Sequence, residues 1–196
     1  MKYDPQKHYR RSIRLKGYDY TQAGGYFITI CMWQKQCLFG EIADKKMYLN
    51  RYGEVIQYNW FDLIRRYAYI QLDAFVIMPN HVHGIIWLLN PRGVGADLEN
   101  SSVERTNISG EPAPTIHGDN AKSKSAKCCG LPEIIQGFKT ASATRINQLR
   151  RTTGVAVWQR NYYEHIIRND MALQNIRKYI INNPIFWQKD ELNQNS

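Results

Sequence analysis

Two apolar segments, residues 69–78 and 82–89, flank the dipeptide Pro79-Asn80 near the middle of the chain. Their length and β-forming composition predict two strands, and the Pro-Asn dipeptide predicts a tight connection between them. An antiparallel hairpin limits the possible folds, because alternate side chains of each strand project to opposite faces and other elements must cover the apolar ones. We therefore expect a sheet that is organised around this central hairpin.

The other elements follow from the spacing of apolar residues and from turn residues on either side of the hairpin. Asn169-Asp170 suit the start of a helix, and Pro184 requires that helix to stop at or just before it. The elements expected outside the hairpin are a strand at 25–33, a helix at 52–66, a helix at 131–151, an extended segment at 155–167 and a last helix from about 169. The helical positions expected to face inward are Val55, Ile56, Trp60, Leu63, Ile64, Ile134, Ile135, Phe138, Ile146, Leu149, Leu173, Ile176 and Ile180.

The resulting order is β, α, β, β, α, β, α. It predicts an α+β fold with a ferredoxin-like (RRM-like) antiparallel sheet and helices packed on one face. Such a sheet serves many purposes, so the order of elements does not select a function.

Residues 91–130 differ in composition from the rest of the chain. They contain three Pro, five Gly and few large apolar residues, and their five basic residues balance their five acidic ones. We interpret this segment as an exposed insertion. The expected organisation is a basic N-terminal arm at 1–20, one domain at 21–187 that the insertion interrupts, and a C-terminal tail at 188–196.

The chain carries a formal net charge of +9, and none of this excess lies in the insertion. A basic excess predicts a polyanionic partner, with nucleic acid first and an anionic membrane surface second. No run of about 18 apolar residues could span a bilayer, and the basic first twenty residues lack the apolar stretch of a signal peptide. Four cysteines form no CxxC pair, so we expect free thiols in the cytoplasm.

His81 and His83 follow the Pro-Asn turn directly. Residues i and i+2 of a strand face the same way, so both imidazoles project from one side and could bind one ion. The alternative is two histidines that form ordinary hydrogen bonds on a sheet face, and a lone His-x-His pattern by itself favours that alternative.

Tyr179 and Asn183 lie four residues apart at the end of the last helix. This spacing places a phenol oxygen and an amide oxygen on one helical face, where both could address the same point. The alternative is a core tyrosine followed by an Asn-Pro sequence that ends the helix. Tyr162 and Tyr163 are competing nucleophiles, but they lack an Asn or Gln four residues later and lie in a predicted extended segment.

Together, these patterns resemble a known family. The sequence His-Val-His after a Pro-Asn turn, followed by a helix ending Tyr-Ile-Ile-Asn-Asn-Pro, resembles the single-tyrosine HUH transposases, especially the REP-associated tyrosine transposases. Residues 158–168, which begin Trp-Gln, and residues 135–140 resemble two further blocks of that family. The resemblance covers residues 21–90 and 131–187, and the insertion is a departure from it.

The resemblance implies a DNA strand transferase and endonuclease. Tyr179 would attack single-stranded DNA at hairpin-forming repeats, and would leave a 5′-phosphotyrosine and a free 3′-hydroxyl. His81, His83 and Asn183 would hold a divalent metal, Mg²⁺ or Mn²⁺, of which Mn²⁺ suits a mixed nitrogen and oxygen shell better. His165 is a possible accessory residue. A DNA-processing role implies a place on the nucleoid in the cytoplasm.

Basic residues at several places are expected to contact DNA phosphates. These candidates are Arg10, Arg11, Arg14, Lys16, Lys139, Arg145, Arg160 and Arg168. Two other functions share the charge and the fold: a non-catalytic, domesticated nucleic-acid-binding protein, and a hydrolase whose metal activates water. The sequence leaves open whether the chain acts as a monomer or a homodimer.

Overall fold

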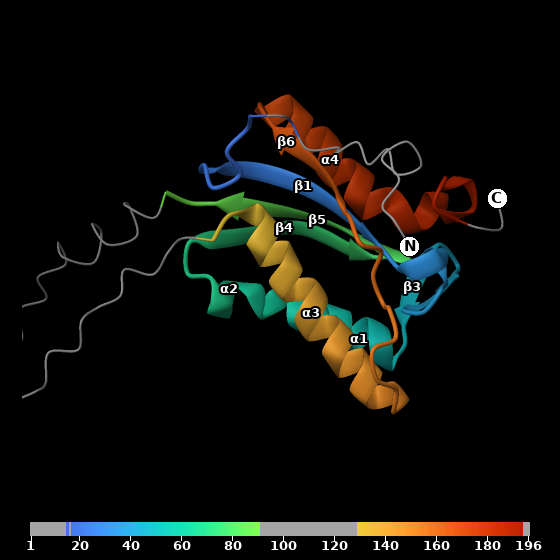
Figure 1. Cartoon of the computed structure of the whole chain (residues 1–196). Helices are drawn as coiled ribbons and strands as arrows, with labels where there is room; N and C mark the ends of the chain where they lie inside the picture. The colour runs from blue at the N-terminus through green and yellow to red at the C-terminus, as the bar shows by residue number, and fades with distance from the viewer. Residues whose placement is uncertain (1–14, 16, 91–128, 194–196) are drawn as a thin grey trace, which may run out of the picture.

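The computed structural model describes residue 15 and residues 17–90 and 129–193 of the chain (Figure 1). Four strands form one sheet in the order β4-β5-β1-β6, and each neighbouring pair is antiparallel. These strands are β1 (Gly24–Cys31), β4 (Ile70–Ile77), β5 (His81–Leu88) and β6 (Tyr163–Ile167). The α+β fold predicted from the sequence is confirmed, and this strand order is the ferredoxin-like one.

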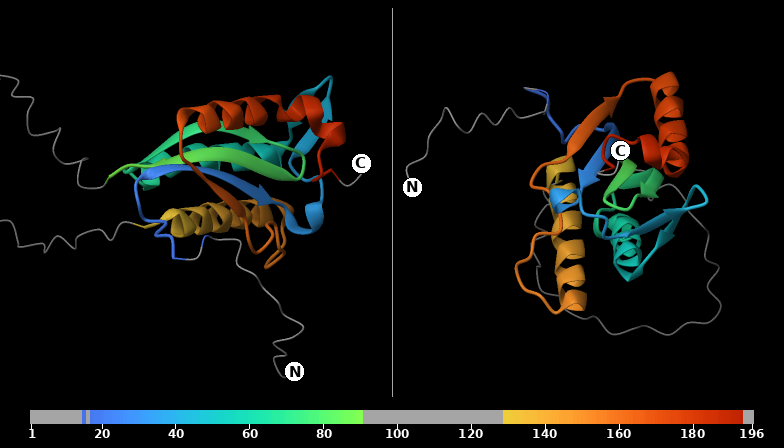
Figure 2. Two further views of the ribbon diagram at one scale, coloured as in Figure 1. Left: turned by 90° about the horizontal axis from the view of Figure 1, so that it is seen from above. Right: turned by 90° about the vertical axis from the view of Figure 1, so that its right-hand side faces the viewer.

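Helices cover both faces of this sheet. On one face lie α1 (Arg51–Phe61), α2 (Leu63–Arg66) and α3 (Leu131–Arg150), whereas α4 (Asp170–Asn182) lies on the other. Figure 2 shows the sheet between α4 and the layer of α1 and α3. The prediction of helices on one face therefore holds for the first three helices and is wrong for α4.

The helix boundaries have local causes. The side chain of Asn50 accepts the N–H groups of Tyr52 and Gly53 at the start of α1, and Asn169 accepts the N–H of Ala172 at the start of α4. Both are N-caps that satisfy backbone donors with no partner inside the helix. At Pro184 the α-helix has already ended, and the chain continues as the 3-10 helix η2 (Asn183–Lys189).

The main core lies between the sheet and the layer of α1 and α3. Trp60 is fully buried and stacks on Phe75 with ring centroids 4.3 Å apart, while Phe138 meets it edge-on at 5.6 Å. Gly84 of β5 lies beneath this indole, and a Cβ there would stand 2.4 Å from Trp60 Cζ2. The absence of a side chain at Gly84 therefore allows the indole to reach the sheet.

A second, smaller apolar cluster lies between the sheet and α4. Its buried members are Phe27, Ile85, Ile167, Leu173 and Ile180. Phe27, Ile85 and Ile167 come from strands. Each occupies a position that alternates along its strand with residues facing the main core, as the pleat of a strand requires.

A short hairpin of β2 (Gly40–Ala43) and β3 (Lys46–Leu49) follows the 3-10 helix η1 (Trp33–Lys35), and neither was predicted. The turn residues Asp44 and Lys45 have φ angles of 48° and 60°. Two successive left-handed residues are typical of a type I′ hairpin turn, which usually contains Asn-Gly or Asp-Gly. Asp-Lys lacks that signal.

Several inward and extended positions also differ from the predictions. Ile64 and Leu149 were expected inside but are 52% and 40% exposed, whereas Ile56, Trp60 and Phe138 are fully buried as predicted. The predicted extended segment at 155–167 contains a strand only at its end, together with a single bridge between Met32 and Trp158.

Some predictions fall on parts of the chain that the structure leaves undescribed. Arg10, Arg11, Arg14 and Lys16 lie outside the described residues, as does the predicted insertion up to residue 128. Within the described ranges, none of the helices combines the length and hydrophobicity that a bilayer crossing requires.

Candidate metal and nucleophile site

His81 and His83 open strand β5 and point to the face that α4 covers. They pair with Cys31 and Thr29 of β1, their ring centroids lie 4.5 Å apart, and their exposed fractions are 0% and 2%. Val82, between them, faces the main core and is also fully buried. The structure therefore brings the two imidazoles together, as strand alternation predicts.

Hydrogen bonds fix the protonation pattern of His81. Asn80 donates both N–H bonds of its amide, to the carbonyl oxygens of Lys35 (3.0 Å) and Leu192 (2.8 Å). Its Oδ1 lies 2.7 Å from His81 Nδ1 and can only accept, so Nδ1 carries the proton. The lone pair of His81 Nε2 is therefore free to face the site.

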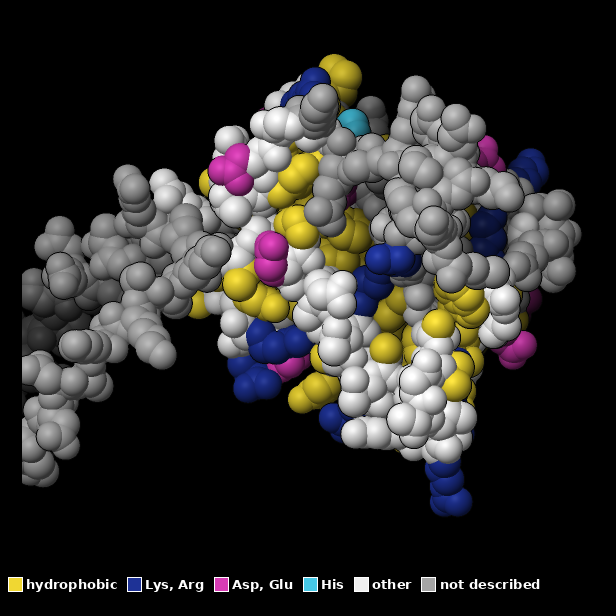
Figure 3. All heavy atoms as spheres, in the orientation of Figure 1, with side chains coloured by type: hydrophobic (Ala, Val, Ile, Leu, Met, Phe, Trp, Pro, Cys, Tyr) yellow, Lys and Arg dark blue, Asp and Glu magenta, His cyan; other side chains and the backbone are white. Residues whose placement is uncertain are grey.

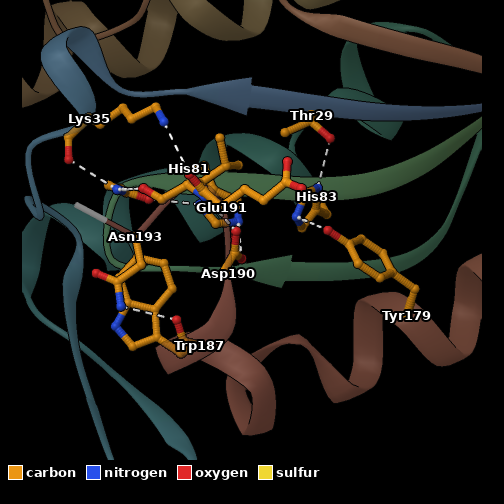
Figure 4. Close-up of polar contacts among 11 residues, drawn as sticks. Thr29, Lys35, His81, His83, Tyr179, Trp187, Asp190, Glu191 and Asn193 are labelled. Atoms are coloured by element: carbon orange, nitrogen blue, oxygen red, sulfur yellow. Dashed lines mark hydrogen bonds and ion pairs between the residues drawn. The ribbon is translucent and has the colours of Figure 1, made fainter. Parts of the chain in front are cut away.

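His83 connects the sheet to helix α4. Its Nδ1 lies 2.8 Å from Thr29 Oγ1, and its Nε2 lies 3.3 Å from the phenol oxygen of Tyr179. Phe27 stacks on the same imidazole, with ring centroids 5.5 Å apart. Figure 4 shows Tyr179 reaching from the helix towards His83, while Thr29 approaches from the opposite side.

Tyr179 and Asn183 project from the end of α4 and the start of η2. Tyr179 is 49% exposed, whereas Asn183 is buried. Partial burial raises the pKa of the Tyr179 phenol, Asp190 adds to this effect, and Asn183 opposes it. The two side chains line one cleft together with His83, so the helical spacing of four residues brings them to the same place.

Asp73 holds α4 against the sheet. Its two carboxylate oxygens accept bonds from Arg177 Nε (2.9 Å) and Nη2 (2.6 Å), and Trp87 Nε1 donates to the second oxygen at 3.2 Å. The pairing of β4 with β5 is irregular between Leu72 and Phe75, next to this residue. Since Arg177 precedes Tyr179 by two positions, this two-pronged contact sets where the tyrosine lies.

The segment after η2 also reaches the site, which the sequence did not predict. Asp190 Oδ2 lies 3.7 Å from His81 Nε2, and the ligand atoms of His81, His83 and Asp190 all lie within 4.8 Å of one another. Lys35 Nζ donates to the Glu191 carbonyl at 3.2 Å. Asp190, which falls within the predicted tail at 188–196, thus lies beside the imidazoles.

The donor atoms suit a divalent cation. His81 Nε2 and Asn183 Oδ1 are buried and have no hydrogen-bond partner among the described residues. Buried polar atoms are rarely left without a partner, and a bound cation would satisfy both of these atoms. Two imidazole nitrogens, an amide oxygen and the nearby Asp190 carboxylate form a mixed set that Mn²⁺ and other divalent metals accept.

The electrostatics favour neutral imidazoles. Burial lowers the pKa of His81 to about 2, with the adjacent His83 adding to the effect, and burial lowers the pKa of His83 to about 3. Both rings therefore offer lone pairs rather than positive charge near neutral pH. Burial raises the pKa of Asp190, against the opposing effect of the Leu192 backbone N–H.

A cleft of about 640 Å³ opens beside these residues. Aromatic rings of Phe27, Tyr163 and Phe186 form part of its wall, and Lys189 adds a basic side chain. The cleft thus combines flat apolar surfaces with a positive charge next to the phenol of Tyr179. Unpaired nucleic-acid bases stack on surfaces of this kind.

The remaining site candidates are more scattered. His165 is exposed on β6, opposite Phe27 and on the same face as the histidine pair, but it does not line the cleft. Arg160 and Arg168 are exposed near the ends of the segment that contains β6. Arg145 is exposed in the other layer, with its guanidinium 5.6 Å from the ring centroid of Tyr58.

Lys139 requires a correction. It was expected in solvent, but it is buried and its ammonium donates to the carbonyl oxygens of Gln159 (2.6 Å) and Arg160 (3.0 Å). Burial lowers its pKa to about 8. The amphipathic pattern of α3 could not reveal this role, because the segment that Lys139 holds crosses the helix from 20 residues away. Lys139 is therefore a structural residue and is not available to contact phosphate.

The fold and the site define a class: an α+β domain in which a buried histidine pair on a ferredoxin-like sheet faces a helical tyrosine. The chain is 37% identical over 192 residues to an uncharacterized protein of Haemophilus influenzae, and the match covers 97% of each chain. The chain therefore belongs to the same family as that protein. No protein-family model matches the chain.

Two solved structures are similar in fold. One is a REP-associated tyrosine transposase bound to a REP hairpin, with a TM-score of 0.49, 17% identity, and coverage of 91% of this chain and 72% of that one. The other is a transposase candidate of Deinococcus radiodurans R1, with a TM-score of 0.44, 14% identity, and coverage of 87% and 97%. At these TM-scores neither match bears on function, which we infer from the residues of the site.

Proposed function

We propose that this protein is a metal-dependent strand transferase and endonuclease for single-stranded DNA, with Tyr179 as the nucleophile. The observation that carries the proposal is the position of the Tyr179 oxygen, 3.3 Å from His83 Nε2 and beside buried donor atoms of His81 and Asn183 that have no partner. Such an arrangement of a nucleophile beside a set of cation ligands suits phosphoryl transfer. The motif resemblance to single-tyrosine HUH transposases supports the same reading.

His81, His83 and Asn183 would hold Mg²⁺ or Mn²⁺. The bound ion would supply positive charge that polarises the scissile phosphate and stabilises the charge that develops on it. Asp190, which the sequence did not indicate, stands close enough to the imidazoles to serve as a further oxygen ligand. A carboxylate in this set favours hard cations such as Mg²⁺ and Mn²⁺ over softer metals.

The proposed reaction exchanges one phosphodiester bond for another. The Tyr179 oxygen loses its proton to solvent and bonds to phosphorus, and the bond from phosphorus to the 3′ oxygen breaks. That oxygen takes up a proton and leaves as a free 3′-hydroxyl, while the 5′ end stays linked to the tyrosine. Because the ester bond is conserved, a 3′-hydroxyl of another DNA end can reverse the step without nucleotide hydrolysis.

The chain's own residues would position the DNA. Rings of Phe27, Tyr163 and Phe186 offer surfaces on which unpaired bases can stack next to the nucleophile. Exposed Arg160 and Arg168 are proposed to neutralise phosphates, together with the N-terminal residues Arg10, Arg11, Arg14 and Lys16. We propose hairpin-forming repeats as the substrate, in accordance with the family resemblance, and a location on the nucleoid follows from that substrate.

Covalent trapping tests this function directly. Labelled single-stranded DNA that contains a hairpin is incubated with the protein and Mg²⁺ or Mn²⁺ and analysed on a denaturing gel. We expect an adduct on the 5′ side of the break that disappears in Tyr179→Phe, a variant that retains the ring and DNA binding. His81→Ala should also abolish cleavage, because it removes an ion ligand.

Tyr163→Phe is the matched control, since Tyr163 is equally exposed and lines the same cleft. An adduct that persists in Tyr179→Phe and vanishes in Tyr163→Phe would move the nucleophile to β6. Cleavage without an adduct would favour a hydrolase, and binding without metal-dependent cleavage would favour a non-catalytic DNA-binding protein.

A further inference from the structure

A second cleft lies in the other layer, where the start of α1 meets the end of α3. It has a volume of about 660 Å³ and its surface is mainly polar. Its lining residues are Arg51, Tyr52, Gln148, Leu149, Arg150 and Arg151. Three arginines thus converge on one small hollow.

Tyr52 holds two of these arginines in place. The guanidinium carbon of Arg51 lies 5.0 Å from the Tyr52 ring centroid, and that of Arg150 lies 5.4 Å from it. Arg51 Nη2 also donates to the Tyr52 hydroxyl at 3.0 Å. Cation–π contacts of this kind orient guanidinium groups while leaving their N–H donors available.

Within the part of the chain that the structure describes, no carboxylate pairs with these three arginines. Among the described residues, Arg65, Arg66 and Arg177 form ion pairs, but Arg51, Arg150 and Arg151 form none. Glu54 lies in the first turn of α1 without pairing to any of them.

Arg51 is also poorly placed for the stability of its helix. It is the first residue of α1, where the backbone dipole already concentrates positive charge and an acidic residue is preferred. Arg150, by contrast, suits the last turn of α3. Two arginines on one ring repel each other, so the arrangement of Arg51 beside Arg150 favours an anion between or above them.

The pattern extends along the seam between the two helices. Arg145 lies over the ring of Tyr58, as Arg150 lies over Tyr52, so α3 presents guanidinium groups to tyrosines of α1 at successive positions. Figure 3 shows separate Lys and Arg side chains on the lower part of the face in view, with uncharged side chains between them. Several fixed positive charges match a ligand with repeated negative charges better than they match a single small anion.

The seam begins at the same end of the sheet as the histidine pair. Asn50, which caps α1, donates its backbone N–H to the Phe39 carbonyl, and Phe39 donates to the Pro79 carbonyl, two residues before His81. The end of α3 and the end of α4 lie on the same side of the molecule in Figure 1, in opposite layers. DNA that leaves the catalytic cleft at this end can therefore reach both surfaces.

We propose that Arg51, Arg150 and Arg151 bind the sugar-phosphate backbone of the DNA segment that flanks the cleavage site. The proposal rests on the proposed function for the identity of its ligand, but its site lies in the opposite layer from the catalytic residues. The arginines contribute affinity and hold the flank of the substrate, whereas the chemical step belongs to the α4 face.

Salt-dependent DNA binding tests the proposal. We compare wild type, the double variant Arg51→Gln/Arg150→Gln and a control double variant, Lys45→Gln/Lys46→Gln, which removes the same charge from exposed positions elsewhere. The probe is a hairpin DNA with a single-stranded flank, and Kd is measured at several salt concentrations. We expect the arginine variant to raise Kd on the order of tenfold and to reduce the salt slope by about two.

The conservative variant Arg51→Lys/Arg150→Lys retains the charge and should retain most of the slope, which separates phosphate binding from a change in folding. Equal Kd and slope in the arginine and control variants would overturn the proposal, as would a wild type that does not bind the probe. If binding depends on the arginines but wild type forms no covalent adduct, the arginine site stands and the proposed catalytic function fails.

Discussion

The two faces of one sheet are built in opposite ways. Along β5, Val82 and Gly84 face a closed apolar core in which Trp60 stacks on Phe75, whereas His81 and His83 face the α4 side of the sheet, where His83 lines an open cleft. Alternation of side chains is the sole reason that such different environments meet within four residues. The pleat of a single strand therefore separates the residues that stabilise the fold from those of the candidate site.

The register of β5 determines which residues reach each face of the sheet. A slip of one residue would move both imidazoles into the apolar core and bring Val82 to the cleft. The apolar face therefore enforces the register that places the polar one. Substitutions on the core face should therefore lower stability, whereas substitutions on the cleft face should alter function first.

The largest effect should come from Trp60→Ala. The variant removes a fully buried indole that packs on Phe75 and Phe138, and should lower the free energy of unfolding by about 3–5 kcal/mol. Urea denaturation followed by circular dichroism measures this change. A loss below about 1 kcal/mol would mean that the core face is not the principal source of stability.

Gly84→Ala should have the next largest effect. The added methyl group would lie 2.4 Å from Trp60 Cζ2, and relief of this overlap should lower the free energy of unfolding by about 1–3 kcal/mol. Gly137→Ala is the matched control. Its new Cβ would meet only the far end of the Tyr67 side chain, and alanine favours a helix, so the control should be neutral or stabilising. Equal losses in both variants would contradict this account.

Asn183→Leu should affect metal binding more than stability. The substitution removes a buried amide oxygen that has no partner, so the free energy of unfolding should fall by less than about 1 kcal/mol or should rise. At the same time the rise in melting temperature that Mn²⁺ gives wild type should shrink, because a proposed ligand is lost. A large loss of stability with an unchanged Mn²⁺ effect would place Asn183 among structural residues.

The smallest effect should be the loss, in acid, of the stability that the Asp73–Arg177 ion pair contributes. The Arg177 guanidinium holds the pKa of Asp73 below its usual value. The resulting stability is complete above the unfolded-state pKa, near 4, and is lost as pH falls through the lower folded-state pKa. Arg177 is partly exposed, so the amount is about 1 kcal/mol or less.

Asp73→Asn should therefore be less stable than wild type near neutral pH, and the difference should disappear as pH falls below 4. Urea denaturation at a series of pH values measures it. A difference between the two proteins that stays constant down to the lowest pH would exclude the charge of Asp73 as its cause.

Much of the fold was predictable because local patterns and tertiary packing agree. The Pro79-Asn80 turn, the apolar spacing around Trp60 and the Asn169 cap each determine their element within a few residues. The β2–β3 hairpin was not predictable in this way. Its turn places Asp44 and Lys45 in the left-handed conformation, and these two residues are not the Asn-Gly or Asp-Gly pair that usually predicts such a turn.

The site was predictable where residues lie close in sequence and only in part elsewhere. His81 with His83, and Tyr179 with Asn183, are related by the periods of a strand and a helix. Asp190 was not found because no local period relates it to the histidines; it reaches them through the path of η2. Lys139 was misplaced for the same reason, since its carbonyl partners belong to a different segment.

The three hydrogen bonds of the Asn80 amide link the geometry of the site to a residue that is synthesised much later. Its orientation, and with it the protonated nitrogen of His81, depends on the Leu192 carbonyl, which is synthesised 112 residues later. At translation rates of about 5–20 residues per second, this interval is on the order of ten seconds. We expect the imidazole of a growing chain to exchange between tautomers during that time, so that the site acquires its final proton arrangement only after most of the domain has been made.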